Sequence, residues 1–563
     1  MPALPLTLAV AHGLAPPAPV RVWHLTDVHT DPYYVAGSDA SGCFCETTAS
    51  CGTCGSHCVL QRNATLAALK WGSSEGNCAT PKSLYESALS FMATEAPDAS
   101  MVYFTGDFSE AGATSGCDGS GAGKVAQRQL LDIMHYDWHT LTKAFPHAKL
   151  IGSFGNHDSS PGDVYYGDER QAWLYENVTE SLWGVGLEPS DAVPLKRGGY
   201  YAVQVLEGLT VVSLNINLWV TQNPEATNPN SSAAAEGERQ LLWLEATLAT
   251  VEARGDVAHL LGHQPPDGSN AWVAGLWPRF ASVVARHRTT VMGLFWGHVH
   301  TDQWSIVRDC REVNATDGYV ETTGIKWCSG GGDYAPGDAF GAGVDGICPL
   351  LPAEWSVDQR GVPACEAVCD KEASCVGFTL EFATKGAECC FRTGSTASKP
   401  PDPASKNRCY EKPPQLACDG APAAVMLPGP SLTEGYPAKN PAVRLLEFDP
   451  VTFVLTEVRT FTADLHAANA PGGSLKWGLE YDFRQQFGMA DLTPSSFDNL
   501  SARLAEEDSP LWARYKGMGD GALFCSSYSS KTAPFPPRSP CASCEGECKA
   551  TFLALLNGTN LSG

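Results

Sequence analysis

Residues 295–300 read FWGHVH: an apolar run, a glycine, and two histidines separated by one valine. In an extended or tightly turning segment, residues i and i+2 fall on the same side of the backbone. His298 and His300 can therefore face one point in space, where their imidazole nitrogens could bind a shared metal ion. Such a pair also occurs without any function on solvent-exposed edges. Whether it binds metal here depends on whether other segments of the chain end in the same way.

Four other segments have the same form, a short β-rich run followed by a turn with metal-binding residue types. They are VRVWHLTDVH (20–29) with Asp27 and His29, SMVYFTGDF (100–108) with Asp107, KLIGSFGNHD (149–158) with Asn156, His157 and Asp158, and VAHLLGHQPP (257–266) with His263. Such runs predict buried strands, and ligands gather outside the carboxyl ends of strands in an α/β sheet. We therefore expect five strands to deliver these side chains to one edge. The glycines at 106, 155, 262 and 297 are expected to let the backbone turn sharply there.

The ordered set D-x-H, G-D, G-N-H-D, G-H and G-H-x-H resembles the motifs of the calcineurin-like metallophosphoesterase superfamily. The resemblance implies an α/β fold, a four-layer αββα sandwich, and two metal ions. It implies that Asp107 bridges the ions together with a water or hydroxide. The other ligands are then divided between the ions: Asp27, His29 and His300 hold the first, and Asn156, His263 and His298 hold the second.

The ligand types also bear on the identity of the metal. Imidazole and carboxylate ligands suit zinc, although iron and manganese bind them too. Purple acid phosphatases, in the same superfamily, place a metal-binding tyrosine three residues after the bridging Asp, whereas this chain has Glu110 there. We therefore expect two zinc ions rather than an iron–tyrosinate centre.

The expected chemistry is hydrolysis at phosphorus. Two divalent ions about 3.5–4 Å apart clamp a phosphoryl group and lower the pKa of bound water towards about 7. The hydroxide attacks in line with the leaving oxygen, and the ions stabilise the developing charge. His157 lies where the family uses a histidine to donate to the phosphate or to protonate the leaving group, and we expect Asp158 to orient that imidazole.

Within the superfamily, the chain resembles the acid sphingomyelinase and acid sphingomyelinase-like phosphodiesterase family. The resemblance covers nearly the whole chain except 311–419. It is carried by LTDVHTDPYY (25–34), RGGYYAVQVLEGLTVVSLNINLW (197–219), HQPPDGSNAW (263–272), GHVHTDQW (297–304), NPAVRLLEFDP (440–450) and LKWGLEYDFRQQFGMADLTPSSFDNLSARL (475–504). We expect the last stretch to be helical, within a segment 420–524 that ends the catalytic domain of 19–310 and adds a helical C-terminal region. A Cys-rich tail follows at 525–563.

Two departures from the family affect substrate and mechanism. Acid sphingomyelinase carries a saposin-like module before its catalytic domain, but here the first metal-binding strand begins near residue 20. This layout resembles the sphingomyelinase-like phosphodiesterases, whose substrates include nucleotides and related soluble phosphodiesters or pyrophosphates. The family histidine four residues after the bridging Asp is Ala111 here, so Glu110, His135 or His139 is a candidate to replace it.

Several features predict export. The 21 cysteines are clustered, which suits an oxidised compartment, although two C-x-x-C pairs leave structural zinc as an alternative. Seven N-x-S/T sequons predict glycosylation, at Asn63, Asn177, Asn230, Asn314, Asn499, Asn557 and Asn560. Residues 1–18 resemble a secretory signal peptide, and no apolar run is long enough to span a membrane. A net charge of −24 argues against polymeric nucleic acid as a partner. We expect a secreted or lysosomal protein.

The segment 311–419 has a different character. About residues 348–412 resemble a PAN/apple module, with cysteines at 365, 369, 375, 389, 390 and 409 around the strand-like VGFTLEF. Such small disulfide-rich modules bind carbohydrate or protein, or are inert decorations. Cys310 and Cys418 flank the segment, and we predict that they pair and close its neck.

The sequence therefore predicts an exported two-zinc phosphodiesterase that acts on a small phosphodiester, nucleotide or phospholipid head group. One alternative is a true sphingomyelin phosphodiesterase, giving ceramide and phosphocholine, with the apple-like module or a C-terminal helix contacting the membrane. A monoesterase is also open, because metals and hydroxide do not separate mono- from diesters. An alternative of another class is a catalytically decayed binding or adhesion protein that uses the apple-like module, and only Ala111 supports it.

Overall fold

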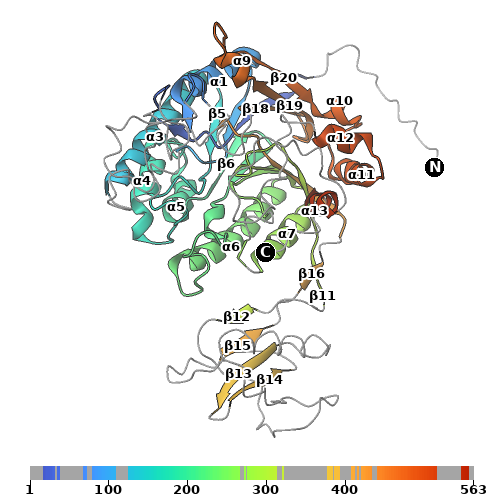
Figure 1. The fold of residues 1–563 in the computed structure, drawn as a ribbon. Helices are drawn as coiled ribbons and strands as arrows, with labels where there is room; N and C mark the ends of the chain where they lie inside the picture. Colours follow the sequence, from blue (N-terminus) through green and yellow to red (C-terminus); the bar gives the residue numbers. More distant parts are fainter. Residues whose placement is uncertain are drawn as a thin grey trace, which may run out of the picture. The chain divides into compact units, whose positions relative to one another are not determined.

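The chain divides into two compact units, one of residues 1–309 and 420–563 and one of residues 310–419 (Figure 1). The computed structural model describes residues 17–31, 34–37, 68–72, 79–109, 124–266, 272–273, 275–313, 320–322, 377–383, 386–392, 408–411, 415–417, 420–433, 440–516 and 547–556. Residues 1–16 of the predicted signal peptide, Glu110, Ala111 and most of the cysteines lie outside the described residues.

Two six-stranded sheets form the centre of the larger unit. The first has the order β20-β19-β18-β1-β4-β5, with β1 (Val20–Leu25), β4 (Met101–Phe104), β5 (Lys149–Gly152), β18 (Ala442–Phe448), β19 (Leu455–Ala463) and β20 (Trp477–Asp482). The second has the order β10-β17-β9-β8-β7-β6, with β6 (Tyr201–Leu206), β7 (Leu209–Ser213), β8 (Val257–Leu261), β9 (Val291–Trp296), β10 (Ser305–Arg308) and β17 (Pro422–Pro428). In Figure 1 the orange strands β18–β20 continue the sheet that the blue strands begin.

The two sheets pack face to face through fully buried aromatic side chains. The Tyr103 hydroxyl of β4 lies 2.8 Å from Nδ1 of His259 on β8. The ring of Phe295 on β9 lies 5.8 Å from that of Phe448 on β18, centroid to centroid. Because these side chains come from the middle of both sheets, the main core lies between the sheets.

Helices cover the outer faces of the sheets, which confirms the α/β fold and its layers. On the first sheet, Trp23 of β1 contacts Phe91 of α1 (Lys82–Glu95), and α3 (Lys124–Ala144) lies beside α1. On the second sheet, Trp296 of β9 contacts Phe280 of α7 (Leu276–Arg286), and α6 (Ser232–Ala253) packs on β8. The remaining helices and short strands of this unit are α4 (Ala172–Ser181), α5 (Pro189–Gly198), α9 (Leu465–Asn469), α10 (Phe483–Phe487), α11 (Pro494–Ala505), α12 (Pro510–Lys516), α13 (Glu547–Leu556), η1 (Glu169–Gln171), η2 (Ile216–Leu218), β2 (Thr30–Asp31) and β3 (Thr80–Pro81).

The expectation of a helical stretch over 475–504 is wrong at its start. Residues Trp477–Asp482 form β20, an edge strand that pairs antiparallel with β19. The apolar residues Trp477, Leu479 and Tyr481 alternate, which is the period of a strand, and the register shifts between Thr460 and Phe461 of the partner strand. Helices α10 and α11 follow, so only the later part of the stretch is helical.

The smaller unit contains a four-stranded antiparallel sheet. Its order is β12-β15-β13-β14, with β12 (Val320–Thr322), β13 (Gly377–Ala383), β14 (Gly386–Arg392) and β15 (Arg408–Glu411). Strand β13 confirms the strand expected for VGFTLEF. Strands β11 (Arg311–Val313) and β16 (Gln415–Ala417) pair separately. The resemblance to an apple module stays a prediction.

Cys310, which immediately precedes β11, is disulfide-bonded. Its predicted partner Cys418 lies outside the described residues, one residue after β16 in the chain. The ladder of β11 and β16 ends at the pair Arg311 and Ala417, next to both cysteines in sequence. The pairing of Cys310 with Cys418 therefore stays a prediction, which a mass-spectrometric disulfide map would test.

We expect the larger unit to fold without residues 310–419. The two ends of this segment are adjacent, because the Gly420 amide donates to the Asp309 carbonyl at 3.2 Å and Arg308 donates to the Gly420 carbonyl. Replacing 310–419 by a short Gly-Ser linker should keep one cooperative unfolding transition, with its midpoint within about 4 °C of the parent, measured by calorimetry.

The matched control is a chain that ends at residue 419. It lacks β17 and β18, which are interior strands, so β9 and β1 would each lose a hydrogen-bonded neighbour. It should fail to fold. A linker variant that behaves like this truncated control would contradict the independence of the larger unit.

Candidate metal centre

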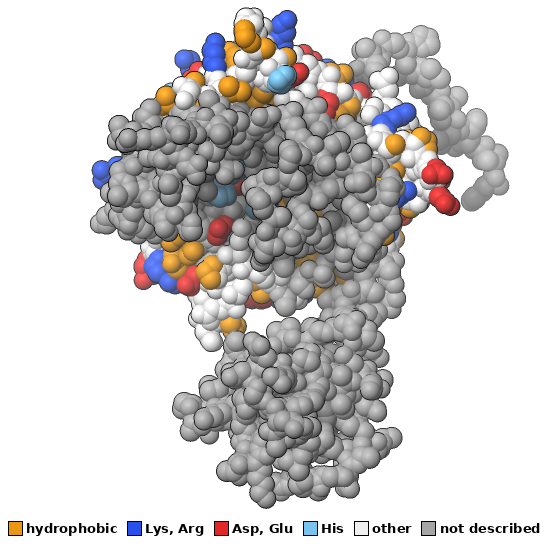
Figure 2. Space-filling model, viewed as in Figure 1, with side chains coloured by type: hydrophobic (Ala, Val, Ile, Leu, Met, Phe, Trp, Pro, Cys, Tyr) orange, Lys and Arg blue, Asp and Glu red, His pale blue; other side chains and the backbone are white. Residues whose placement is uncertain are grey.

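All five strands predicted to carry metal ligands are present, and their carboxyl ends meet at one edge. Strands β1, β4 and β5 are parallel in the first sheet, and β8 and β9 are parallel in the second. Each predicted ligand follows its strand within four residues. Figure 2 shows histidine and acidic side chains together near the middle of the face of this unit.

The backbone at this edge is unusual. Five of the seven predicted ligands are non-glycine residues with left-handed φ between +45° and +73°: Asp27, His29, Asp107, His298 and His300. Asp and His tolerate this region better than most residues, but each such residue costs roughly 1–3 kcal/mol and persists only when its surroundings hold it. Strain is therefore concentrated at the candidate centre.

The four glycines play a different part from the one expected. Of these, Gly106 alone has a positive φ, +94°. At Gly155 an added Cβ would overlap Asp107, and at Gly297 it would overlap Thr26 and lie 2.8 Å from Oδ2 of Asp27. At Gly262 it would meet Ile216 and Trp296. The ligand residues themselves make the tight turns, and most of the glycines are needed so that neighbouring turns can approach closely.

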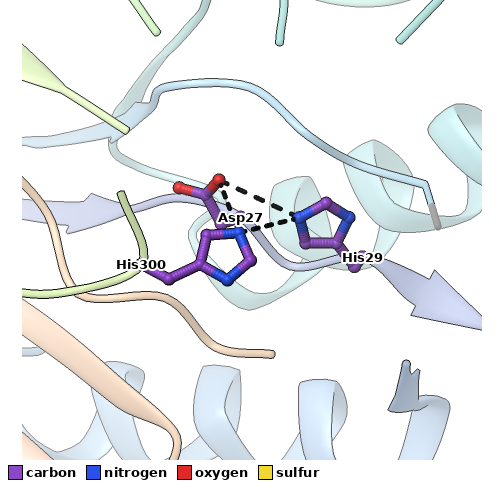
Figure 3. A group of neighbouring side chains, drawn as sticks. All are labelled: Asp27, His29 and His300. Carbon is purple, nitrogen blue, oxygen red and sulfur yellow. Dashed lines mark hydrogen bonds and ion pairs between the residues drawn. The ribbon is translucent and has the colours of Figure 1, made fainter. Parts of the chain in front are cut away.

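The first predicted group of ligands converges in space (Figure 3). Nε2 of His300 lies 3.2 Å from Oδ1 of Asp27 and 3.2 Å from Nε2 of His29. Nε2 of His29 lies 3.9 Å from the same Asp27 oxygen. All three side chains are buried, and their candidate ligand atoms lie close enough together to surround one ion.

The second predicted group also converges. Oδ1 of Asn156 lies 3.1 Å from Nε2 of His263 and 2.9 Å from Nδ1 of His298. Asp107 lies between the two groups, because its Oδ2 is 3.1 Å from Nε2 of His263 and 3.5 Å from Nε2 of His29. The structure thus brings together every residue predicted to bind metal, with Asp107 in the bridging place.

Hydrogen bonds to backbone carbonyls fix which imidazole nitrogens face the centre. Nδ1 of His29 lies 3.0 Å from the Ser109 carbonyl, and Nδ1 of His263 lies 2.6 Å from the Thr105 carbonyl. A carbonyl only accepts, so each Nδ1 carries hydrogen and each Nε2 of the neutral ring offers a lone pair to the centre.

Asp163 fixes the Asn156 amide, and the sequence did not identify it. The Asn156 Nδ2 donates to Oδ1 of Asp163 at 2.8 Å, which turns Oδ1 of Asn156 towards His263 and His298. The Asp163 amide also donates to the Asn156 carbonyl. No spacing rule reveals this role, because Asp163 comes from an irregular turn seven residues beyond the ligand.

The electrostatics fit a bound cation. Burial lowers the pKa of His29 and of His298 to about 3, so both rings are neutral. Burial also acts to lower the pKa of His263, but the Asp107 and Asp27 carboxylates outweigh it and raise that pKa to about 9. The two carboxylates thus attract positive charge to the centre, and imidazole nitrogens, an amide oxygen and carboxylates together suit divalent metal ions.

His157 lies beside this centre but is not part of the two groups. Its backbone amide donates to Oδ1 of Asp107 at 2.8 Å, and its ring centroid is 5.0 Å from that of His29. Its ring is partly exposed, and a candidate ligand atom lies near those of His29 and Asp107. The ring is thus available to a group bound at the centre.

Asp158 has a different role from the one expected. Its carboxylate accepts from the backbone amides of Asp107, Phe108 and Gly155 at 2.7–2.9 Å, and no described contact joins it to the His157 ring. It is completely buried, and burial and the Asp107 carboxylate raise its pKa to about 7 despite the backbone donors. Asp158 ties the turn after β4 to the turn after β5.

Two of the three candidates to replace the family histidine at 111, His135 and His139, lie on α3 and are not among the clustered ligand candidates. Nε2 of His135 lies 2.9 Å from Oδ1 of Asn177, which places it between α3 and α4. His139 is exposed on α3. Glu110 lies outside the described residues.

Comparison with known proteins gives two family matches. The model described as calcineurin-like phosphoesterase matches residues 20–302, and the model described as the acid sphingomyelin phosphodiesterase C-terminal region matches residues 423–556. Acid sphingomyelinase-like phosphodiesterase 3b of Homo sapiens is 23% identical over 513 residues, which cover 89% of this chain and 84% of that protein.

Other similar proteins carry related names. Sphingomyelin phosphodiesterase of Homo sapiens is 30% identical over 300 residues, which cover 51% of this chain but only 43% of that protein. Cyclic GMP-AMP phosphodiesterase SMPDL3A of Rattus norvegicus is 21% identical over 527 residues, 91% of this chain and 86% of that protein. A solved dimetal phosphatase from Danio rerio has a TM-score of 0.30 and 13% identity over 52% of this chain and 84% of that chain, a likeness too weak to carry an argument.

The substitution Gly155→Ala should damage the centre, because its Cβ would overlap the Asp107 side chain and amide. We expect metal affinity to fall about 10–100-fold, measured by competition with a chelator. Gly478→Ala in β20 is the matched control, since no atom lies within 4 Å of the added Cβ. Equal affinity in the two variants would contradict the close approach of these turns.

Proposed function

Because the chain belongs to the calcineurin-like phosphoesterase family, we propose that it is a phosphodiesterase of the acid sphingomyelinase-like group that uses two metal ions. The observation that carries this proposal is the convergence of seven ligand candidates, six of them buried and His298 half-buried, at the carboxyl ends of five strands. The second family match, over residues 423–556, supports the narrower group.

In this proposal, Asp27, His29 and His300 hold one ion, Asn156, His263 and His298 hold the other, and Asp107 bridges them. When bound, the ions clamp a phosphoryl group and lower the pKa of an attacking water towards about 7. We propose zinc for both, since four imidazoles with carboxylate and amide oxygens suit it. The backbone and side-chain contacts of Ser109, Thr105 and Asp163 keep the ligand atoms pointed at the centre.

His157 is the residue we propose to donate to the phosphoryl group or to protonate the leaving oxygen. Its backbone is fixed by Asp107, and its ring borders the first group of ligands. Among the described residues outside the ligand set, it is the imidazole that lies at the centre. This role is consistent with Ala111, which removes the other histidine that the family offers.

The substrate is proposed to be a small phosphodiester, nucleotide or phospholipid head group. Relatives named for sphingomyelin and for cyclic GMP-AMP are both similar to this chain. A true sphingomyelin phosphodiesterase is the second candidate, favoured by the 30% identity over 300 residues. A catalytically decayed binding protein is disfavoured. A decayed site would be expected to lose the grouping of its metal ligands, whereas the seven candidate ligands here lie together.

We propose that the protein is secreted or lysosomal and glycosylated. The disulfide at Cys310 supports an oxidising compartment. Of the seven sequons, Asn230 lies exposed in a turn, Asn499 lies exposed on α11, and Asn177 lies on α4 beside His135; the other four are outside the described residues. Among the described residues, no helix has the length and apolar character needed to cross a bilayer. The smaller unit is proposed to bind carbohydrate or protein.

The test is hydrolysis of sphingomyelin micelles, cyclic GMP-AMP and nucleoside triphosphates at pH 5 and 7 by the full chain loaded with zinc. We expect turnover of at least one substrate and its loss by more than about 100-fold in Asp107→Asn. Sphingomyelin turnover would favour the second candidate. No turnover of any substrate by a protein that binds two ions would contradict the proposed activity.

His157→Ala separates the proton donor from the metal ligands. We expect kcat to fall about 10²–10⁴-fold, the usual contribution of general acid catalysis, while two ions remain bound. His139→Ala is the matched control, because His139 is exposed on α3. Unchanged kcat in His157→Ala, or loss of an ion, would contradict the assigned role.

A further inference from the structure

The turn that carries His298 and His300 continues into a buried polar cluster around Asp302. One carboxylate oxygen of Asp302 accepts from Nη2 of Arg444, and the other accepts from the hydroxyls of Thr460 and Tyr481. Arg444, Thr460 and Tyr481 are all buried. Four polar side chains are thus joined by hydrogen bonds two residues beyond a predicted metal ligand.

This cluster joins the two sheets. Asp302 follows β9 of the second sheet, whereas Arg444, Thr460 and Tyr481 come from β18, β19 and β20 of the first. All three donors belong to the region matched by the acid sphingomyelin phosphodiesterase C-terminal model, residues 423–556. That region contributes none of the seven predicted ligands, yet it contacts the turn that bears two of them.

Arg444 also holds the end of β17. Its Nη2 donates to the Pro428 carbonyl at 2.7 Å, and its Nη1 donates to the Leu427 carbonyl at 3.4 Å. The next residues reach both metal-binding turns: the Ser431 amide donates to the His300 carbonyl, and the Thr433 amide donates to the Asp27 carbonyl at 3.1 Å. One buried guanidinium therefore supports the turns of two strands, β1 and β9.

The need for such support follows from the backbone. His298 has a φ of +73° and His300 a φ of +58°, conformations that non-glycine residues leave unless neighbouring contacts hold them. Charge-assisted hydrogen bonds in a buried place are strong and directional. A carboxylate fixed by three donors from a sheet can therefore keep the adjacent turn in a strained conformation.

We propose that Asp302, held by Arg444, Thr460 and Tyr481, is a positioning residue that fixes the His298–His300 turn for metal binding. This inference rests on the proposed function, since it presupposes the two ions. By this proposal the region beyond residue 420 supports the metal centre through hydrogen bonds, although that region supplies no ligand. The ion held by Asp27, His29 and His300 should depend most on the cluster, because His300 is the ligand nearest to Asp302 in sequence.

Tyr481→Phe tests the proposal with little change in shape, because it removes a single hydroxyl donor. Tyr85→Phe is the matched control: Tyr85 is fully buried in α1, and its hydroxyl donates to the Asp137 carbonyl at 2.8 Å and not to the Asp302 cluster. We measure zinc affinity of both full-length variants by chelator competition, and thermal unfolding of both without metal. The proposal predicts one ion bound about 10–100-fold more weakly in Tyr481→Phe, with similar unfolding of the metal-free proteins.

Two variants of Thr460 test the same role of Asp302 at another donor. Thr460→Val removes the other hydroxyl donor to Asp302 at nearly constant shape, and Thr460→Ser restores a hydroxyl. We expect Thr460→Val to weaken zinc binding and Thr460→Ser to retain most of the parent affinity. A purely structural contact would lower the unfolding midpoint in Thr460→Val without a selective loss of one ion.

The outcomes separate the two proposals. If the parent binds two ions and Tyr481→Phe and Thr460→Val bind them as tightly as Tyr85→Phe, the positioning role is overturned and the proposed function stands. If the parent binds no metal, both are overturned. Selective weakening of one ion, with rescue in Thr460→Ser, supports the positioning role.

Discussion

The structure depends on negative charge buried in one place, the carboxylates of Asp27 and Asp107. Asp27 and Asp107 lie within 4 Å of imidazole nitrogens whose other ring nitrogens already donate to backbone carbonyls. Buried carboxylates of this kind are stable only when positive charge lies beside them. In the proposed function divalent cations supply that charge, and the strained turns, the close glycines and the hydrogen bonds around the ligands keep the ligand atoms together.

The larger unit uses chain from both sides of residues 310–419. Strands β17 and β18 are interior members of the two sheets, so the segment after residue 420 is part of the sandwich itself. It also supplies Arg444 and the amides of Ser431 and Thr433, which contact the turns of the ligands. An inserted segment is tolerated because its ends, at Asp309 and Gly420, already lie together.

The sequence predicted the parts of the centre that follow from local pattern. Each ligand stands directly after a short β-rich run, and parallel strands bring such residues to one edge, so Asp27 and His298 could be placed before the structure was known. The sequence did not predict strand β20, because Trp477–Asp482 alternates over only three apolar residues and its pairing with β19 is irregular. The interpretation of the glycines was also incomplete, since the collision that Gly155 avoids involves a residue 48 positions away in the chain.

The sequence did not reveal the residues that support the ligands, for a related reason. Asp163 and Asp302 act through contacts made across turns and between sheets. No spacing in the sequence distinguishes them from aspartates that lie on the surface. Asp158 was placed correctly beside the centre, but its partners turned out to be three backbone amides rather than the neighbouring imidazole. Roles of this kind depend on how separate turns pack, which only the three-dimensional structure shows.

The central claim is that two divalent ions occupy the space between these turns. Anomalous diffraction from crystals of the zinc-loaded protein, collected on both sides of the zinc edge, tests it directly. We expect two anomalous peaks about 3.5–4 Å apart, one bonded to Asp27, His29 and His300, the other to Asn156, His263 and His298, with Asp107 touching both. No peak among these residues, or a single ion with Asp107 bound to nothing else, would contradict it.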